Sequence, residues 1–213
     1  MNIKIFTTGP LDVNCYIVSD ETKECAIIDC GAFTENEQKS IIDYIRQEQL
    51  VPKHLLCTHA HIDHIAGNKA MSDAFGLKPE YHRLDQKLMA DYQTQAEYIL
   101  GMRLMYDLPM GENLLNDGDV VEFGNTRLRV MLTPGHSPGG VFFVNDEERR
   151  AFCGDTIFCG SIGRTDFMGG SMFQIINSLR LISQMPDDTE LYPGHGPQTT
   201  IGYELAHNPY MDR

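Results

Sequence analysis

Short apolar runs, some of them alternating with polar residues, occupy the N-terminal part of the chain. Ile3 and Ile5 alternate with polar neighbours, and three further runs cover residues 13–20, 24–29 and 54–59. Runs of about four to eight residues, bounded by turn residues, are typical of strands. The sequence therefore predicts a sheet that begins at the N-terminus, and its buried strand at 54–59 leads straight into a group of histidines.

A helical period replaces this pattern at several places. Thr34 and Glu37 have the spacing of a capping box, in which the two side chains bond the backbone at the start of a helix. Ser171 and Gln174 repeat that spacing before an apolar segment that Pro186 ends. Helices are predicted within residues 31–47, 63–76, 84–100 and 173–185.

The segment from Leu84 to Leu100 carries an apolar stripe at helical spacing, and Gly101 suits the C-terminal cap of one long helix. The stripe consists of Leu88, Met89, Tyr92, Ala96 and Ile99. A stripe of this kind packs against a core more often than it lines a substrate pocket, so we interpret it as core packing.

Strands return in the C-terminal half, where a turn at Gly124 and Asn125 and the polar turn NDEE each separate two apolar runs. The predicted strands lie within residues 120–124, 127–136, 141–144, 149–155 and 190–196. The order is strand-rich, helical, strand-rich, helical, which indicates an α/β (α+β) protein. Because no linker, repeat or low-complexity tract divides the chain, one domain over residues 1–213 is predicted.

Composition narrows the functional classes. The chain has 213 residues, of which 42% are hydrophobic, and a formal net charge of -13. That charge opposes binding to nucleic-acid phosphates and to anionic membrane surfaces. The first residues resemble neither a signal peptide nor a membrane span, so a cytoplasmic location is the default expectation. The six cysteines are scattered without a CxxC pair, and we predict buried free thiols rather than disulfides.

Polar groups of the kinds that bind metals lie at the ends of four predicted strands. His59 ends the first, with His61 just beyond it, and the ends of the others carry His136, Asp155 and His195, each beside glycine or proline. His59 and His61 are two residues apart, so they point to one side of an extended segment. Groups on strand-end loops of a rigid sheet are typical of a site.

Asp63 and His64 add two more ligands where a helix is predicted to begin. Five histidines and two carboxylates exceed what one tetrahedral zinc ion needs, whereas two neighbouring cations that share a bridging carboxylate would use them all. Imidazole with carboxylate suits zinc, iron or manganese rather than calcium or magnesium. We therefore expect two divalent metal ions, with zinc as the first choice and iron or manganese as alternatives.

The motif HxHxDH, followed by separated His, Asp and His, resembles the metallo-β-lactamase superfamily over nearly the whole chain. The resemblance implies a four-layer αββα sandwich, with two sheets face to face, helices outside and metals at one edge. It also implies that His59, His61 and His136 hold one metal, that Asp63, His64 and His195 hold the second, and that Asp155 bridges them.

Within that superfamily, GDTIFCGSIGRTDFMGG and ELYPGHGPQTTIGYELAHNPY resemble short glyoxalase-II-like hydrolases. This implies hydrolysis of a thioester of the S-D-lactoylglutathione type by a metal-bridging hydroxide, with Asp63 and Asp155 catalytic and Arg164 gripping a substrate carboxylate. An ion pair within the protein is the alternative role for Arg164. The additional C-terminal helical region of glyoxalase II, which helps bind glutathione, does not follow here, so the thiol carrier stays open. Partners beyond a small-molecule thioester are not expected, and the oligomeric state is open.

The chief alternative is a persulfide dioxygenase, because GRTDF also resembles that group. The resemblance then implies one ferrous ion on His59, His136 and Asp155. Lactone and lactam substrates are weaker alternatives. Asp29 is predicted to orient a ligating histidine or to serve in a turn. Structural roles are predicted for the histidines outside the motif, which are His54, His82 and His207.

Overall fold

The first sheet contains five strands whose spatial order follows the chain. A computed structural model describes residues 1–211, and the sheet comprises β1 (Asn2–Thr8), β2 (Val13–Ser19), β3 (Glu24–Ile28), β4 (Val51–Leu56) and β5 (Pro79–Glu80). β1, β2 and β3 are antiparallel neighbours, and β4 and β5 continue the sheet in parallel with β3. All seven residues of β2 are buried, because both of its faces are covered.

The second sheet has six strands in the order β13-β12-β9-β8-β7-β6. In chain order these are β6 (Val120–Phe123), β7 (Thr126–Leu132), β8 (Val141–Asn145), β9 (Arg150–Gly154), β12 (Glu190–Pro193) and β13 (Thr199–Thr200). β12 pairs with β9 in parallel, and the other neighbours are antiparallel. A small hairpin, β10 (Ile157–Phe158) with β11 (Ser161–Ile162), follows β9.

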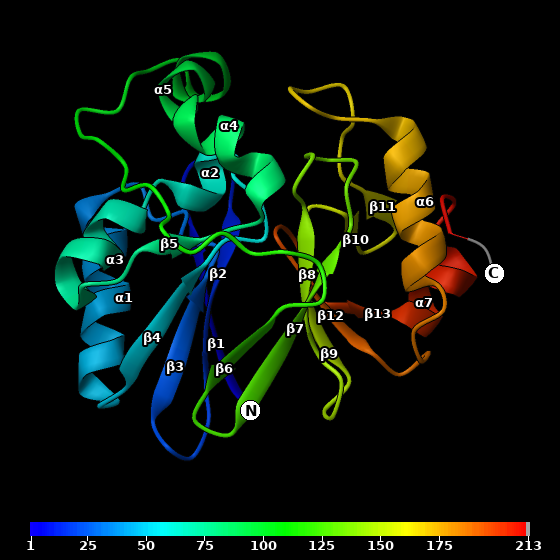
Figure 1. Cartoon of the computed structure of the whole chain (residues 1–213), viewed down its shortest axis with the longest axis horizontal. Coiled ribbons are helices and arrows are strands. Elements are labelled where there is room, and N and C mark those ends of the chain that lie inside the picture. Colours follow the sequence, from blue (N-terminus) through cyan, green and yellow to red (C-terminus); the bar gives the residue numbers. More distant parts are fainter. Residues whose placement is uncertain (212–213) are drawn as a thin grey trace.

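Helices cover the outer faces of both sheets, which makes four layers (Figure 1). α1 (Glu35–Gln47) and α3 (Asn68–Phe75) cover the first sheet, and α6 (Met172–Ile182) and α7 (Ile201–His207) cover the second. The Thr34–Glu37 capping box forms in full, and the Ser171 side chain accepts the bond from the Gln174 backbone N–H.

Three apolar clusters hold these layers together. The cluster between the sheets includes Tyr16 and Ile28 from the first sheet and Phe143 and Phe152 from the second. Alternate residues of the same strands face outward, so that Ile17 packs toward α1 and Phe142 toward α6. The predicted αββα fold class is therefore confirmed, and the contact between the sheets forms its central core.

The predicted helix at 84–100 is wrong as one element. The segment is divided into a 3₁₀ turn η1 (Arg83–Asp85), α4 (Gln86–Ala90), α5 (Tyr92–Gln95) and a π-helical turn η2 (Ala96–Leu100). Leu88, Met89 and Ala96 are buried as the stripe predicted, in a cluster with α2 (Ile62–Ile65). The helix predicted at 63–76 is also divided, because Ala66 and Gly67 separate α2 from α3.

Several predicted strands end earlier than the sequence pattern suggested. β4 stops at Leu56, β7 at Leu132 and β12 at Pro193, so the histidines follow in loops. Within residues 1–211, no helix has the length and apolar character that crossing a bilayer requires. All six cysteines lie in this range as free thiols; five are buried, and Cys159 is partly exposed.

His54, on β4, links the first sheet to β6, an edge strand of the second sheet. Its Nδ1 lies 2.7 Å from Glu80 Oε1 on β5, and its Nε2 lies 3.0 Å from the Glu122 carbonyl oxygen on β6. Burial alone would lower the pKa of His54, but the Glu80 carboxylate outweighs it, and the pKa is raised above the ordinary 6.5. The charged imidazolium is therefore favoured in the folded state.

We predict that His54→Gln destabilises the protein by about 1 to 2 kcal/mol at about pH 5.5, because a charge-assisted bond is lost. A raised folded-state pKa contributes stability that is present below the unfolded pKa and lost as pH rises through the folded value. The difference between the unfolding free energies of wild type and His54→Gln should therefore be smaller at about pH 9. Urea unfolding at both pH values checks this, with the exposed His207→Gln as control; an equal loss at both would contradict it.

Candidate metal centre

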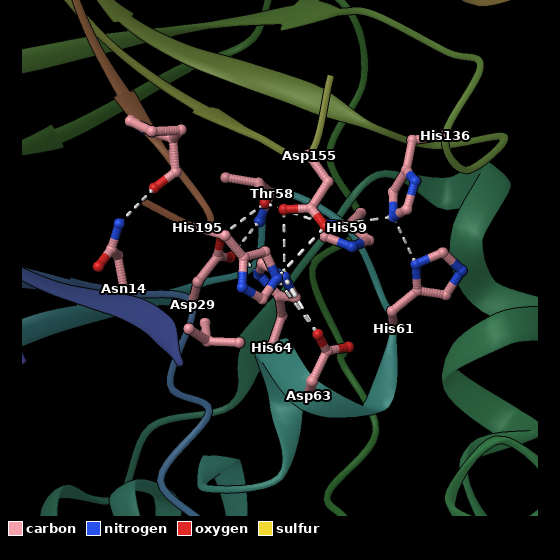
Figure 2. A network of polar contacts seen from close by, with 12 residues as sticks. Asn14, Asp29, Thr58, His59, His61, Asp63, His64, His136, Asp155 and His195 are labelled. Carbon is pink, nitrogen blue, oxygen red and sulfur yellow. Dashed lines mark hydrogen bonds and ion pairs between the residues drawn. The ribbon is translucent and has the colours of Figure 1, made fainter. Parts of the chain in front are cut away.

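The seven side chains predicted as metal ligands lie together where strands of both sheets end (Figure 2). The loop after β4 carries His59 and His61, and Asp63 and His64 follow on α2. The β7–β8 loop and the ends of β9 and β12 supply the remaining three, His136, Asp155 and His195. Residues far apart in the chain thus meet at one edge of the sandwich.

Six of these side chains form two groups of three. In each group, one ligand-type atom per residue lies within 4.8 Å of the others. The first group is His59, His61 and His136, and the second is Asp63, His64 and His195. These are the two sets that the family resemblance implied for two metals.

Asp155 lies between the two groups. Its Oδ2 is 3.5 Å from His136 Nε2 in the first group and 3.5 Å from His195 Nε2 in the second. Its Oδ1 is 3.3 Å from His64 Nε2. A carboxylate in this position reaches both groups at once.

Four histidines are oriented by an oxygen on the far side of the ring. Nδ1 of His136 contacts the Arg164 carbonyl at 2.8 Å, and Nδ1 of His195 contacts the Leu11 carbonyl at 2.9 Å. Nδ1 of His59 lies 3.1 Å from Thr58 Oγ1, and Nδ1 of His64 lies 3.1 Å from Asp29 Oδ2. Such partners fix the ring and leave Nε2 for the site, as is usual for metal-binding histidines.

Asp29 also falls in a third possible group, with His59 and His64. However, its Oδ1 already accepts from the Thr58 backbone N–H at 2.7 Å, and its Oδ2 accepts from Thr58 Oγ1 at 2.6 Å. With both oxygens engaged, Asp29 is better suited to orienting His64 than to holding a cation.

The charges of the two groups differ. Burial is the main cause that lowers the pKa of His61 to about 3, and it also brings the pKa of His59 well below its ordinary value. Neighbouring histidines lower both pKa values further. Burial opposes a charge on His195, but Asp155 and Asp63 outweigh it and raise its pKa to about 10. The pKa of His64 is likewise raised, against burial, by Asp155 and Asp63. A cation in the second group would therefore replace protons, whereas His59 and His61 in the first group offer neutral nitrogens.

Buried polar atoms that make no hydrogen bond test whether a cation fits this site. Within residues 1–211, Nε2 of His59, His61 and His64 and Oδ1 of Asp155 are buried and make no hydrogen bond. An unsatisfied buried polar atom costs about 1 to 3 kcal/mol. Such atoms on His59, His64 and Asp155, together with His61 Nδ1, which lies 2.8 Å from His136 Nε2, are all metal-ligand types and fit one or two divalent cations.

Glycine is required where the backbone passes this cluster. A Cβ at Gly194 would lie 2.1 Å from Asp155 Oδ1 and 2.6 Å from His64 Cε1, and a Cβ at Gly163 would lie 1.7 Å from the Asp155 carbonyl oxygen. No heavy atom fits at such distances. Gly194, next to His195, therefore leaves room for the carboxylate between the two groups, and Gly163 leaves room for the Asp155 backbone.

A cavity of about 410 Å³ opens onto the cluster. Its floor includes His61, Asp63, His136, Asp155 and His195. Its walls are mostly apolar, and their side chains are Leu11, Ile99, Phe158, Ile162 and Phe167. Solvent and a small substrate can thus reach the possible metal ligands from one side.

Arg164 lies at the rim of this cavity, largely exposed. Its Nε and one terminal nitrogen donate to the two Asp166 carboxylate oxygens at 2.8 and 3.1 Å. Its guanidinium also lies over the Phe167 ring. Both roles expected for Arg164 thus remain compatible with its position, because the exposed pair with Asp166 is one that a substrate carboxylate can replace.

Sequence reasoning missed two buried polar residues behind the site, Asp85 and Gln95. Asp85 contacts the loops that carry His59, His61 and His136, and Gln95 contacts the first of these loops. Both occupy positions on the apolar stripe of residues 84–100. A polar residue on such a stripe was the signal that could have identified them.

Comparison with known proteins places this geometry in a family. The model for the metallo-beta-lactamase superfamily matches residues 8–195. Hydroxyacylglutathione hydrolase GloC of Haemophilus influenzae is 32% identical over 220 residues, covering 100% of this chain and 99% of its own.

Two solved structures resemble the fold closely. BLEG-1 B3 metallo-beta-lactamase has a TM-score of 0.90 at 33% identity and covers 99% of both chains. TTHA1623, solved in a di-iron-bound form, has a TM-score of 0.85 at 33% identity, with 98% of this chain and 100% of that one covered. The αββα layers, the two ligand groups at their edge and the match over residues 8–195 together show that this chain belongs to the metallo-β-lactamase superfamily.

Proposed function

We propose that this protein is a metal-dependent hydrolase that cleaves a thioester of the S-D-lactoylglutathione type. The observation that carries the proposal is the position of Asp155, within 3.5 Å of histidine nitrogens from both groups of three. A similar chain named a hydroxyacylglutathione hydrolase, matched over its whole length, supports the choice of a thioester.

The residues that would hold two divalent cations are the two groups of three, with Asp155 shared between them. Zinc is our first choice, and iron or manganese suits the same nitrogen and carboxylate atoms; the di-iron form of TTHA1623 makes iron a strong alternative. When bound, such cations lower the pKa of water to about 7 and polarise a carbonyl oxygen.

The protein's own groups prepare the site for hydrolysis. Asp63 lies on the cavity floor, with Oδ2 3.4 Å from His195 Nε2. Burial opposes its ionisation, but His64 and His195 keep its pKa below the ordinary value. A carboxylate at this position can orient the attacking water and accept its proton. An acyl group bound between the apolar walls would displace water from the cavity, which would strengthen the electrostatic contacts within it.

Two other reactions are alternatives to thioester hydrolysis. A mononuclear-iron persulfide dioxygenase is not favoured, because its three ligands would leave four of the seven clustered side chains without a metal, namely His61, Asp63, His64 and His195. Hydrolysis of a β-lactam is the second candidate, since BLEG-1 B3 metallo-beta-lactamase matches the fold over 99% of both chains. Turnover of a thioester or of a β-lactam distinguishes the two hydrolytic reactions.

The proposed function is tested by measuring metal content and three activities on one purified sample. We expect about two metal ions per chain, thiol release from S-D-lactoylglutathione, little turnover of a chromogenic cephalosporin and no oxygen uptake with glutathione persulfide. Activity should disappear after chelation and return with the metal. Cephalosporin turnover without thiol release would favour the second candidate, and oxygen uptake with one iron per chain would refute hydrolysis.

We predict that Asp155→Asn weakens metal binding by about a hundredfold or more and abolishes hydrolysis, because the shared carboxylate is lost. Competition with a coloured chelator measures the affinity. Asp146→Asn, which removes an exposed carboxylate paired with Arg129, serves as the matched control and should leave the metal affinity unchanged. Wild-type metal affinity in Asp155→Asn would contradict the bridging role.

If Arg164 grips a substrate carboxylate, Arg164→Ala should raise KM for an anionic thioester about three- to tenfold with little change in kcat. KM for an uncharged thioester should not change. Asp166→Asn releases Arg164 from its partner and should lower KM for the anionic substrate. If Arg164→Ala raises KM equally for the charged and the uncharged thioester, Arg164 has a structural role instead.

A further inference from the structure

A fully buried carboxylate joins two of the loops that carry the possible metal ligands. Asp85 Oδ2 accepts from the backbone N–H of Ala60 at 3.0 Å and from Ser137 Oγ at 2.8 Å. Its Oδ1 accepts from the Gly139 backbone N–H at 2.5 Å. Ala60 lies between His59 and His61, and Ser137 follows His136 directly. All three members of the first ligand group are thus one residue from a group that Asp85 holds.

The surroundings of Asp85 are unusual for a buried acid. No salt bridge links it to a cationic side chain within residues 1–211, and its three hydrogen-bond donors all belong to the two ligand loops. A buried carboxylate without a charged partner is costly and persists where its hydrogen bonds compensate. A Cβ at Gly139 would lie 2.8 Å from Asp85 Cγ, so the second loop passes directly against the carboxylate.

Gln95 completes the hold on the first loop. Its Oε1 accepts from the Ile62 backbone N–H at 3.1 Å, and its Nε2 donates to the Ala60 carbonyl at 3.1 Å. The same Nε2 donates to the Leu88 carbonyl at 2.6 Å, which fixes the side chain on its own segment. Asp85 and Gln95 therefore bond the backbone on both sides of His61.

The broken helix at residues 84–100 accounts for this arrangement. Asp85 ends the 3₁₀ turn η1, and Gln95 ends α5 directly before the π-helical turn η2. In one straight helix, residues ten apart would lie about 15 Å apart along the axis. The breaks let both polar side chains reach a loop of three residues, and π-helical turns often occur at functional sites.

We propose that Asp85 and Gln95 are positioning residues that hold His59, His61 and His136 together as one three-ligand cation site. This ligand-loop clamp, defined as the side chains of Asp85 and Gln95, rests on the proposed metal centre. It acts on the first group. His195 in the second group is held separately, by the Leu11 carbonyl, and its neighbour Gly194 accepts from the Asn14 backbone N–H.

The test compares Asp85→Asn with a control at an equally buried acid. Glu204 also has three donors, from Gly160, Thr199 and Asn208, but none of them adjoins a ligand. Zn²⁺ binding to wild type, Asp85→Asn and Glu204→Gln is measured by chelator competition, and unfolding is measured by urea titration. We expect Asp85→Asn to weaken one of two binding steps by about tenfold or more. Glu204→Gln should lose comparable stability while keeping both affinities.

Ser137→Ala provides a milder variant in case Asp85→Asn fails to fold. It removes one of the three donors and should weaken the same binding step by about two- to fivefold. The proposal is overturned if a folded Asp85→Asn, or Ser137→Ala in its place, binds Zn²⁺ as wild type does. It is also overturned if Glu204→Gln loses the same affinity, since the effect would then follow stability alone.

Failure of the proposed function would look different. Wild-type protein that binds two cations but releases no thiol refutes thioester hydrolysis, and a weakened binding step in Asp85→Asn still supports the clamp. Wild-type protein that binds no Zn²⁺ at either step overturns the clamp together with the metal centre.

Discussion

Burial of two apolar sheet faces against each other determines where everything else in this molecule lies. Aromatic and aliphatic side chains from both sheets share one core, and burying each large one contributes about 1.5 to 3 kcal/mol. Once the faces are paired, the ends of β4, β9 and β12 meet at one edge. The possible metal ligands are therefore brought together by packing that involves none of them.

Polar groups concentrated at that edge would oppose folding if they were left without partners. The structure compensates most of them from outside the cluster, through carbonyl groups, Thr58 and Asp29. Three imidazole nitrogens and one carboxylate oxygen of the cluster remain without a hydrogen bond among the described residues. Hydrogen bonds on the outer side of the cluster thus help to offset the cost of the buried polar atoms that lack hydrogen bonds. Local strain that the surrounding structure compensates is common where proteins bind ligands.

The sequence was most informative where local chemistry decides the structure. The Thr34 capping box and the hairpins were predicted from spacing and order, and the family resemblance implied the two groups of three possible metal ligands. Helix breaks at residues 84–100 were not, because helical periodicity describes an apolar face and ignores a polar residue that needs a distant partner. The hydrogen-bond partners of Asp85 and Gln95 lie in loops about 25 to 54 residues away in the chain, and only the tertiary fold brings these partners close. Arg164 shows the same limit, since its pairing with Asp166 depends on the conformation of a loop.

The six cysteines differ in exposure, so a thiol reagent can reach one of them more easily than the others. Of the six cysteines, all within the described residues, five are buried, and Cys159 is partly exposed between β10 and β11. Phe158, next to Cys159, and Ser161, two residues beyond it, line the cavity. A maleimide fluorophore on Cys159 would therefore be attached within two residues of the cavity lining, without any engineered cysteine.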